Sequence, residues 1–309
     1  MEEIRKLKTA YLECCSYQKN LNYKTIKAYT IDLNQFIYFM EENSLEISKA
    51  GISAYITQLH KLYKPKSIKR KIACLKAFFS YLEYEEVLEG NPFKKINVRF
   101  QEPFLLPRTI PINTLQEVLS CAYQEASFTS LTEYKLNAVL RNIAVLELLF
   151  ATGLRVSELC SLKADDIDLI NQTLRVTGKG ARERIVQIVN SDVLTALTAY
   201  YRNFSTPIQQ SGFFFVNRLK RRLSEQSVRF MINNYVEKAG ISLHITPHMF
   251  RHSFATLLLE EDVDIRYIQK LLGHSSITTT QIYTHVTSAK QKDILATKHP
   301  RNKFTLNKG

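Results

Sequence analysis

The sequence predicts a mainly α-helical chain with one small β-hairpin, divided into two domains. Three observations lead to this prediction. Apolar residues recur at helical spacing through residues 7–82. A proline-containing stretch without helical period then interrupts the pattern. Farther on, a single pair of β-rich runs is joined by a glycine-containing turn.

The expected N-terminal domain, residues 1–98, is a small helical bundle. Its helices are marked by four apolar stripes, at residues 7–15, 26–40, 52–59 and 68–82. Gly90, Asn91 and Pro92 stop the last helix. Because the connections between the four stripes are short, a compact bundle is favoured.

Residues 99–111 contain Pro103, Pro107 and Pro111 and predict an extended linker. The second domain, residues 112–309, opens with helices expected at 113–123, 131–152 and 155–162. Runs at 173–177 and 184–189 then flank Gly178-Lys179-Gly180-Ala181, which predicts the hairpin. Helical spacing returns at 224–239 and continues nearly to the end.

Composition limits the class of protein. Hydrophobic residues make up 45% of the 309 positions, which is typical of a globular chain. The 42 basic residues outnumber the 29 acidic ones, which indicates a polyanionic partner, either nucleic acid or an anionic membrane surface. The sequence has no long apolar run, no secretion signal and no CxxC pair among its five cysteines. We therefore expect a cytoplasmic protein with reduced thiols.

One stretch of the N-terminal domain is strongly basic. Between positions 61 and 76 no acidic residue occurs, and closely spaced cations gain affinity for a phosphate backbone by displacing counterions. A solvated helix face explains the same pattern, so both interpretations stay open. The candidate DNA contacts are Lys61, Lys64, Lys66, Lys69, Arg70 and Lys71.

The segment from Thr246 to His252 has the pattern of an anion site at a helix N-terminus. Thr246 suits the N-cap and Pro247 the first helical position. His248, Arg251 and His252 then share one face of the first turns, where a phosphate would fit. A capped helix with polar residues facing water is the plain alternative. The i, i+4 histidines also allow zinc, but the HExxH glutamate is missing and an arginine would lie beside the cation.

Other polar residues are weak signals when taken alone. Arg155 and Glu158 are three residues apart and can pair, which would hold the guanidinium or merely form a surface ion pair. His274 follows a helix-ending glycine, and Tyr283 is one of 16 tyrosines. The Gly178-Lys179-Gly180 turn does not fit the GxxxxGK[ST] phosphate loop.

Taken together and in order, these residues resemble the active-site pattern of the phage integrase family, the tyrosine recombinases. The words ATGLRVSEL, GKGARER, TPHMFRHSFAT and LLGHSSITTTQIYTHV resemble it as well. The likeness is greatest to the Xer group and extends to His299-Pro300-Arg301. The pattern consists of Arg155, Lys179, His248, Arg251, His274 and Tyr283.

The resemblance implies a two-domain recombinase, with a helical, SAM-like core-binding domain and a mixed α+β catalytic domain that clamp DNA. Tyr283 would attack the scissile phosphate to give a 3′-phosphotyrosyl bond, and Arg155 and Arg251 would hold the non-bridging oxygens. Such chemistry needs a base, a further donor and an acid, and His248, His274 and Lys179 are the residue types that supply them. We expect no metal, no cofactor and no ATP requirement.

The resemblance also implies partners. These are a double-stranded DNA site and a tetramer on two sites that is homomeric or shared with a related recombinase. A DNA translocase is a candidate activator, and activation without one stays open. Residues 288–298, with Ile294 and Leu295, would dock on a neighbouring subunit. Dimer resolution and mobile-element integration or excision both fit. The alternatives are a type IB relaxing enzyme, a DNA-binding module without catalysis, and a membrane-surface or metal-dependent protein.

Overall fold

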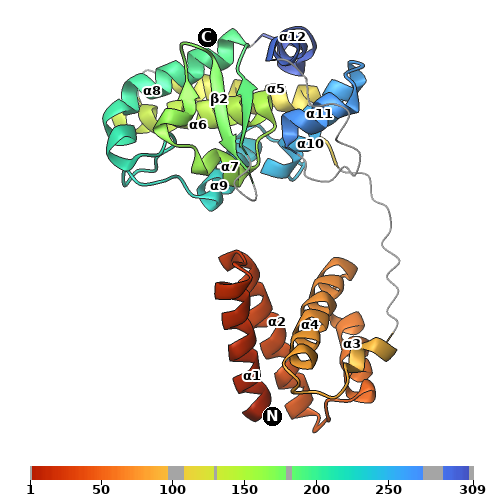
Figure 1. Ribbon diagram of the computed structural model, residues 1–309. Coiled ribbons are helices and arrows are strands. Elements are labelled where there is room, and N and C mark those ends of the chain that lie inside the picture. Colours follow the sequence, from red (N-terminus) through yellow and green to blue (C-terminus); the bar gives the residue numbers. More distant parts are fainter. Residues whose placement is uncertain (1, 97–107, 129–130, 179–182, 274–287, 306–309) are drawn as a thin grey trace. The chain divides into compact units, whose positions relative to one another are not determined.

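The computed structural model describes residues 2–96, 108–128, 131–178, 183–273 and 288–305 (Figure 1). The chain divides into two compact units, Met1–Leu105 and Leu106–Gly309. Most of the expected linker, residues 99–107, lies outside the described residues, so its extended form stays a prediction.

The N-terminal unit is a helical bundle, and each of the four apolar stripes is confirmed as a helix. Their buried faces share one core that includes Tyr11, Phe36, Phe78 and Phe79. Asn22 and Ser48 cap the second and third helices with their side chains, as short polar residues do at N-termini. The elements are α1 (Glu2–Glu13), a π-helical turn (Cys14–Gln18), α2 (Tyr23–Glu42), α3 (Lys49–Leu62), α4 (Pro65–Tyr84) and a 3-10 turn (Pro92–Lys95).

The second unit combines helices with one small sheet. Its elements before and within the sheet are α5 (Ile112–Ser127), α6 (Glu133–Thr152), α7 (Val156–Ser161), a 3-10 turn (Ala164–Asp166), β1 (Ile167–Asp168), β2 (Thr173–Thr177) and β3 (Glu183–Gln187). After the sheet come α8 (Ser191–Ser211), α9 (Glu225–Lys238), α10 (Pro247–Glu260), α11 (Ile265–Leu272), α12 (Ser288–Lys298) and a 3-10 turn (Pro300–Lys303).

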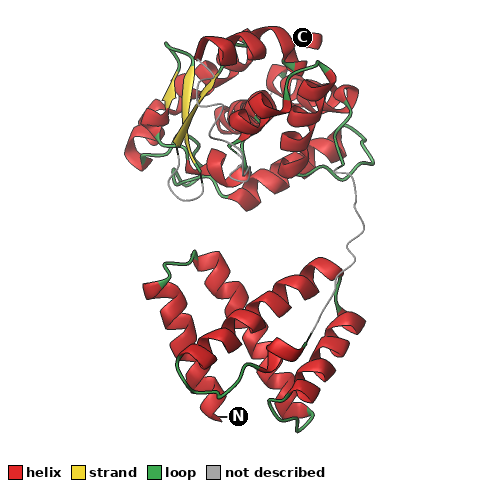
Figure 2. Ribbon diagram, turned by 45° about the vertical axis from the view of Figure 1, so that its right-hand side comes forward, coloured by secondary structure: helices red, strands yellow, loops and turns green. Residues whose placement is uncertain are grey.

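The three strands form one antiparallel sheet in the order β1-β2-β3, seen in yellow in Figure 2. The mainly helical fold and the β2–β3 hairpin are therefore confirmed. Two elements were not anticipated. β1 is only two residues long, and α8 contains three threonines, two tyrosines and Pro207, which weaken its helical signal.

Helix α6 is the central element of this unit. Every residue from Ile143 to Thr152 is buried, and the helix packs against α5, α8 and α10. It ends at Gly153, whose φ of +61° favours glycine. A Cβ there would also lie 2.7 Å from Phe254 and 2.8 Å from Leu272, so the glycine permits the close packing that precedes Arg155.

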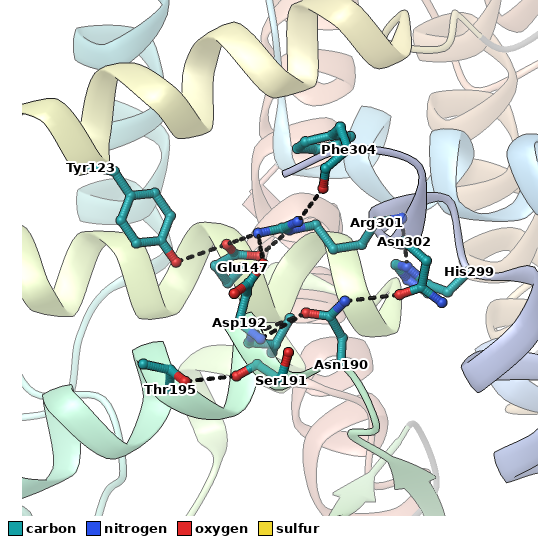
Figure 3. A network of polar contacts seen from close by, with 11 residues as sticks. Tyr123, Glu147, Asn190, Ser191, Asp192, Thr195, His299, Arg301, Asn302 and Phe304 are labelled. Carbon is teal, nitrogen blue, oxygen red and sulfur yellow. Dashed lines mark hydrogen bonds and ion pairs between the residues drawn. The ribbon is translucent and has the colours of Figure 1, made fainter. Parts of the chain in front are cut away.

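A buried ion-pair network ties the end of the chain to α6 and α8 (Figure 3). The Arg301 guanidinium donates from Nε and Nη2 to the Glu147 carboxylate at 3.0 and 3.1 Å, and from Nη2 to Asp192 at 3.0 Å. The Tyr123 hydroxyl donates to Glu147 at 2.9 Å. Arg301 and Glu147 are almost fully buried, so each is the other's main compensation for lost hydration.

Helix α12 docks on its own chain, which differs from the expected docking on a neighbouring subunit. Ile294 and Leu295 are buried in a cluster with Phe254 of α10 and with Leu271 and Leu272 of α11. The expectation came from the family resemblance, and the apolar pair itself does not distinguish a pocket of the same chain from a copy of that pocket on another chain.

We expect Arg301→Met to lower the free energy of unfolding of this unit by about 3–5 kcal/mol, because it leaves the Glu147 carboxylate buried and uncompensated. Urea denaturation of the full chain measures the loss. The control is Arg175→Met, which breaks the more exposed pair with Asp166 and should cost at most about 1 kcal/mol. Equal losses in the two variants would contradict the role given to Arg301.

Candidate active site

Arg155 stands at the N-terminus of α7, and its side chain is held by Glu158 one turn farther on. The Glu158 carboxylate accepts the Arg155 backbone N–H at 2.9 Å and the Arg155 Nη1 at 2.7 Å. The predicted pairing is thus present. It is not a plain surface ion pair, because only 5% of the Glu158 side chain is exposed, whereas Arg155 is 34% exposed.

A third residue, Arg184 of β3, completes this cluster and was missed in the sequence. Its Nη1 and Nη2 donate to the two oxygens of Glu158 at 3.2 and 2.9 Å, and its Nε donates to the Leu271 carbonyl at 3.0 Å. The residue stands within the word GKGARER, but nothing in the hairpin signal separates it from the neighbouring charged residues.

Arg251 approaches the same region from α10. Thr246 and Pro247 take the predicted N-cap and first helical positions, although the Thr246 hydroxyl makes no cap hydrogen bond. Arg251 Nη1 donates to the Gly153 carbonyl at 2.9 Å, and Nη2 donates to the Leu272 carbonyl at 2.7 Å. The Arg251 guanidinium is therefore held on one side by Gly153, two residues before Arg155, and on the other side by Leu272 at the end of α11.

The site carries an excess of positive charge. Burial, followed by the charge of Arg155, lowers the pKa of the Arg251 guanidinium to about 10, so it remains protonated at neutral pH. Burial alone would raise the pKa of Glu158, but the hydrogen bonds and charges of Arg184, and then of Arg155, hold it below its usual value. Two guanidiniums contact one carboxylate, and the charges of Arg155 and Arg184 also act on a third guanidinium, that of Arg251, an arrangement suited to binding an anion.

The two histidines of α10 differ in exposure from the arginine between them. His248 and His252 are both exposed, whereas Arg251 between them is 6% exposed. Burial, then the charges of His248 and Arg251, lowers the pKa of His252. The alternative of a zinc site finds no support in the described part of the chain, where no group of three metal-binding side chains gathers.

Three predicted site residues, Lys179, His274 and Tyr283, lie outside the described residues. Two of them, Lys179 and His274, directly follow described residues, Gly178 and Gly273. Lys179 lies in the sequence between β2 and β3, and β3 carries Arg184. His274 follows Gly273, whose φ is +65° and whose ideal Cβ would lie 3.0 Å from Arg184 Nη1.

In the N-terminal unit the basic run is corrected at Lys71. This lysine is buried, and its amine lies 2.8 Å from a buried Asp32 carboxylate of α2 and contacts Gln35. Arg70 also pairs with Asp32 while remaining partly exposed. The compensating acid comes from another helix, which a search along positions 61–76 does not detect. Lys61, Lys64, Lys66 and Lys69 are exposed.

Comparison with known proteins identifies the family. A model of the phage integrase family matches residues 124–290, and a model of the phage integrase N-terminal SAM-like domain matches residues 9–86. The chain is 52% identical to a tyrosine recombinase of Agathobacter rectalis, with 96% of this chain and 97% of the relative covered. It is 36% identical to the tyrosine recombinase XerD of Listeria monocytogenes, with 94% and 97% covered.

The chain therefore belongs to the phage integrase family, whose members are tyrosine recombinases. Within this family it is a site-specific recombinase of the Xer type. The relatives do not favour the alternative of a type IB relaxing enzyme.

Solved structures agree on the fold. The XerH recombinase bound to its difH substrate matches with a TM-score of 0.68 at 22% identity, over 90% of this chain and 82% of that one. A lambda integrase tetramer bound to a Holliday junction matches with a TM-score of 0.66 at 19% identity, over 89% and 78%. No helix among the described residues is long and apolar enough to cross a membrane.

Proposed function

We propose that this chain cuts and rejoins specific DNA sites through a covalent bond between Tyr283 and a DNA 3′-phosphate. The supporting observation is the cluster in which Arg155 and Arg251 are held by Glu158 and by the Gly153 and Leu272 carbonyls. Guanidiniums fixed in this way are ready to meet the charge that grows on a phosphodiester during in-line attack, without reorganising.

The proposed reaction is a transesterification. The Tyr283 phenol oxygen bonds to phosphorus while the bond from phosphorus to the 5′-oxygen breaks. His248 takes the phenol proton, Lys179 gives a proton to the departing 5′-oxygen, and His274 donates a hydrogen bond to the phosphate. Because the phosphodiester energy is stored in the phosphotyrosyl bond, a 5′-hydroxyl can reverse the step without ATP.

We expect Tyr283→Phe to bind site DNA and form no covalent adduct, because only the phenol oxygen becomes bonded to phosphorus. The adduct is detected on denaturing gels after expression in cells, and sequencing its DNA identifies the site. That sequence also separates dimer resolution from mobile-element integration. The matched control is Tyr267→Phe, which removes a phenol hydroxyl from α11 and should leave the adduct yield unchanged. An undiminished adduct in Tyr283→Phe would refute the proposal.

We expect Arg155→Ala and Arg251→Ala each to slow cleavage by about 100-fold to 1,000-fold while DNA affinity changes by less than about 3-fold. The contact strengthens as charge develops in the transition state, so rate responds more than binding. Single-turnover cleavage at saturating protein gives the rate, and gel-shift titration gives the affinity. Arg155→Ala is the cleaner variant, because Arg184 still compensates the Glu158 carboxylate. Loss of affinity with an unchanged saturated rate would contradict the role.

We also propose that the protein assembles as a tetramer on two DNA sites, with α12 of one subunit seated in the pocket of the next. The lambda integrase relative is a tetramer on a Holliday junction. In the described chain Ile294 and Leu295 fill a pocket of α10 and α11, and each copy in a closed ring offers the same pocket to a neighbour.

We expect the double variant Ile294→Ala with Leu295→Ala to reduce the two-site complex by at least about 10-fold, because truncating two buried aliphatic side chains frees the helix from either pocket. Binding to one site should be kept. Native gels with one or two DNA sites measure both species. Lys292→Ala on the exposed side of α12 is the control. Deletion of residues 289–309 is a poorer test, since it also removes Arg301 from Glu147. A normal two-site complex in the double variant would refute the exchange.

A further inference from the structure

We infer that Arg184 is a positioning residue for catalysis, which holds Arg155 through Glu158 and fixes the end of α11 next to His274. This inference rests on the proposed function. It assigns Arg184 no contact with DNA. Its three contacts, to both oxygens of Glu158 and to the Leu271 carbonyl, join β3 to α7 and to α11.

Arg184 leaves part of the Arg155 guanidinium unoccupied. Because Arg184 engages both Glu158 oxygens, the carboxylate needs only Nη1 and the backbone N–H from Arg155. Among the described residues, none accepts a hydrogen bond from the Nε or Nη2 of Arg155, whose side chain is 34% exposed. Arg184 thus compensates the buried acid, and the remaining donors of Arg155 stay available for a phosphate.

Arg184 also holds the part of the chain that leads to His274. Arg184 Nε holds the Leu271 carbonyl, and Arg251 Nη2 holds the adjacent Leu272 carbonyl. Gly273 follows in the left-handed conformation, and its ideal Cβ would be 3.0 Å from Arg184 Nη1 and 3.1 Å from Cδ. The last turn of α11 is therefore set by two arginines at the point where the proposed phosphate donor His274 begins.

Arg184 occupies an inward-facing position in the sheet. It lies opposite Val176 in the register, and Val176 and Val186 on the same face are buried, whereas Ile185 is 58% exposed. An apolar residue would fit this inward face, and a buried ion pair is seldom more stable than well-packed apolar residues. A strand that places a cation inward and an isoleucine outward departs from the alternation that stability favours, as functional sites do.

The test is single-turnover cleavage of a nicked duplex that carries the sequence captured by the wild-type chain. For Arg184→Met we expect the saturated rate to fall about 100-fold, because small misplacement of Arg155 has a large effect on the reacting geometry. The half-saturating protein concentration should change by less than about 3-fold, since Arg184 does not bind the substrate. Arg184→Lys keeps the charge without the two-pronged geometry and should recover part of the rate, which keeps the test valid if Arg184→Met does not fold. Arg175→Met on β2, whose partner Asp166 lies outside the cluster, should cleave as wild type.

A double variant separates positioning from mere stability. Arg184 is inferred to act through Arg155 and also through the end of α11. The double variant Arg155→Ala with Arg184→Met should therefore cleave more slowly than Arg155→Ala, but faster than the product of the two single defects predicts, because the first change already removes part of what the second affects. Fully multiplicative defects overturn the inference, as does wild-type cleavage by Arg184→Met. If the wild-type chain forms no adduct, the proposed function fails and the inference with it. If the wild-type chain cleaves DNA and Arg184→Met cleaves it equally fast, the inference is refuted and the proposed function stands.

Discussion

The buried Glu158 carboxylate is the point on which the arrangement of the active site depends. It is the acidic partner of both Arg155 and Arg184 in the described cluster. Arg251 lies close enough for the Glu158 charge to influence its pKa. One negative charge among three guanidiniums leaves a surplus that a phosphate diester can neutralise. The free-energy cost of removing water from these cations is met when the protein folds, so the site is already charged and oriented when DNA binds.

Helix α6 connects this cluster to the tail of the chain. Glu147 near its middle receives Arg301, and the Gly153 carbonyl at its end receives Arg251. The half of the helix from Ile143 to Thr152 is buried on every side, so it transmits position as a rigid body, because its neighbours leave no room for tilting. The placement of Arg155, which follows Gly153 by two residues, therefore shares a support with the anchor of the C-terminal segment.

Periodicity and motif order predicted much of this, and the missed features have a common physical origin. The four stripes of the N-terminal unit and the Arg155–Glu158 pair depend on residues a few positions apart, so local pattern identified them. The pairing of Lys71 with Asp32 joins residues 39 positions apart, and the charge count along one helix overlooked it. Arg184 was missed for the same reason, since its partners Glu158 and Leu271 are distant in sequence. The His299-Pro300-Arg301 word was noticed as a likeness, but only the fold reveals Glu147 as the partner of Arg301.

The C-terminal segment from α12 onward makes two distinct contacts, and deleting it would remove both at once. Arg301 anchors the chain to α6 through charge, whereas Ile294 and Leu295 fill an apolar pocket beside the end of α11. Tyr283 lies in sequence between that end of α11, held by Arg184 and Arg251, and α12. In the proposed exchange, moving α12 to a neighbour would displace the end of the chain that follows the proposed nucleophile Tyr283, while the end of α11 held by the guanidiniums would stay in place. Since the same apolar contacts form in either pocket, the exchange costs little in packing, and the geometry of the DNA-bound assembly is left to decide which subunit presents its tyrosine.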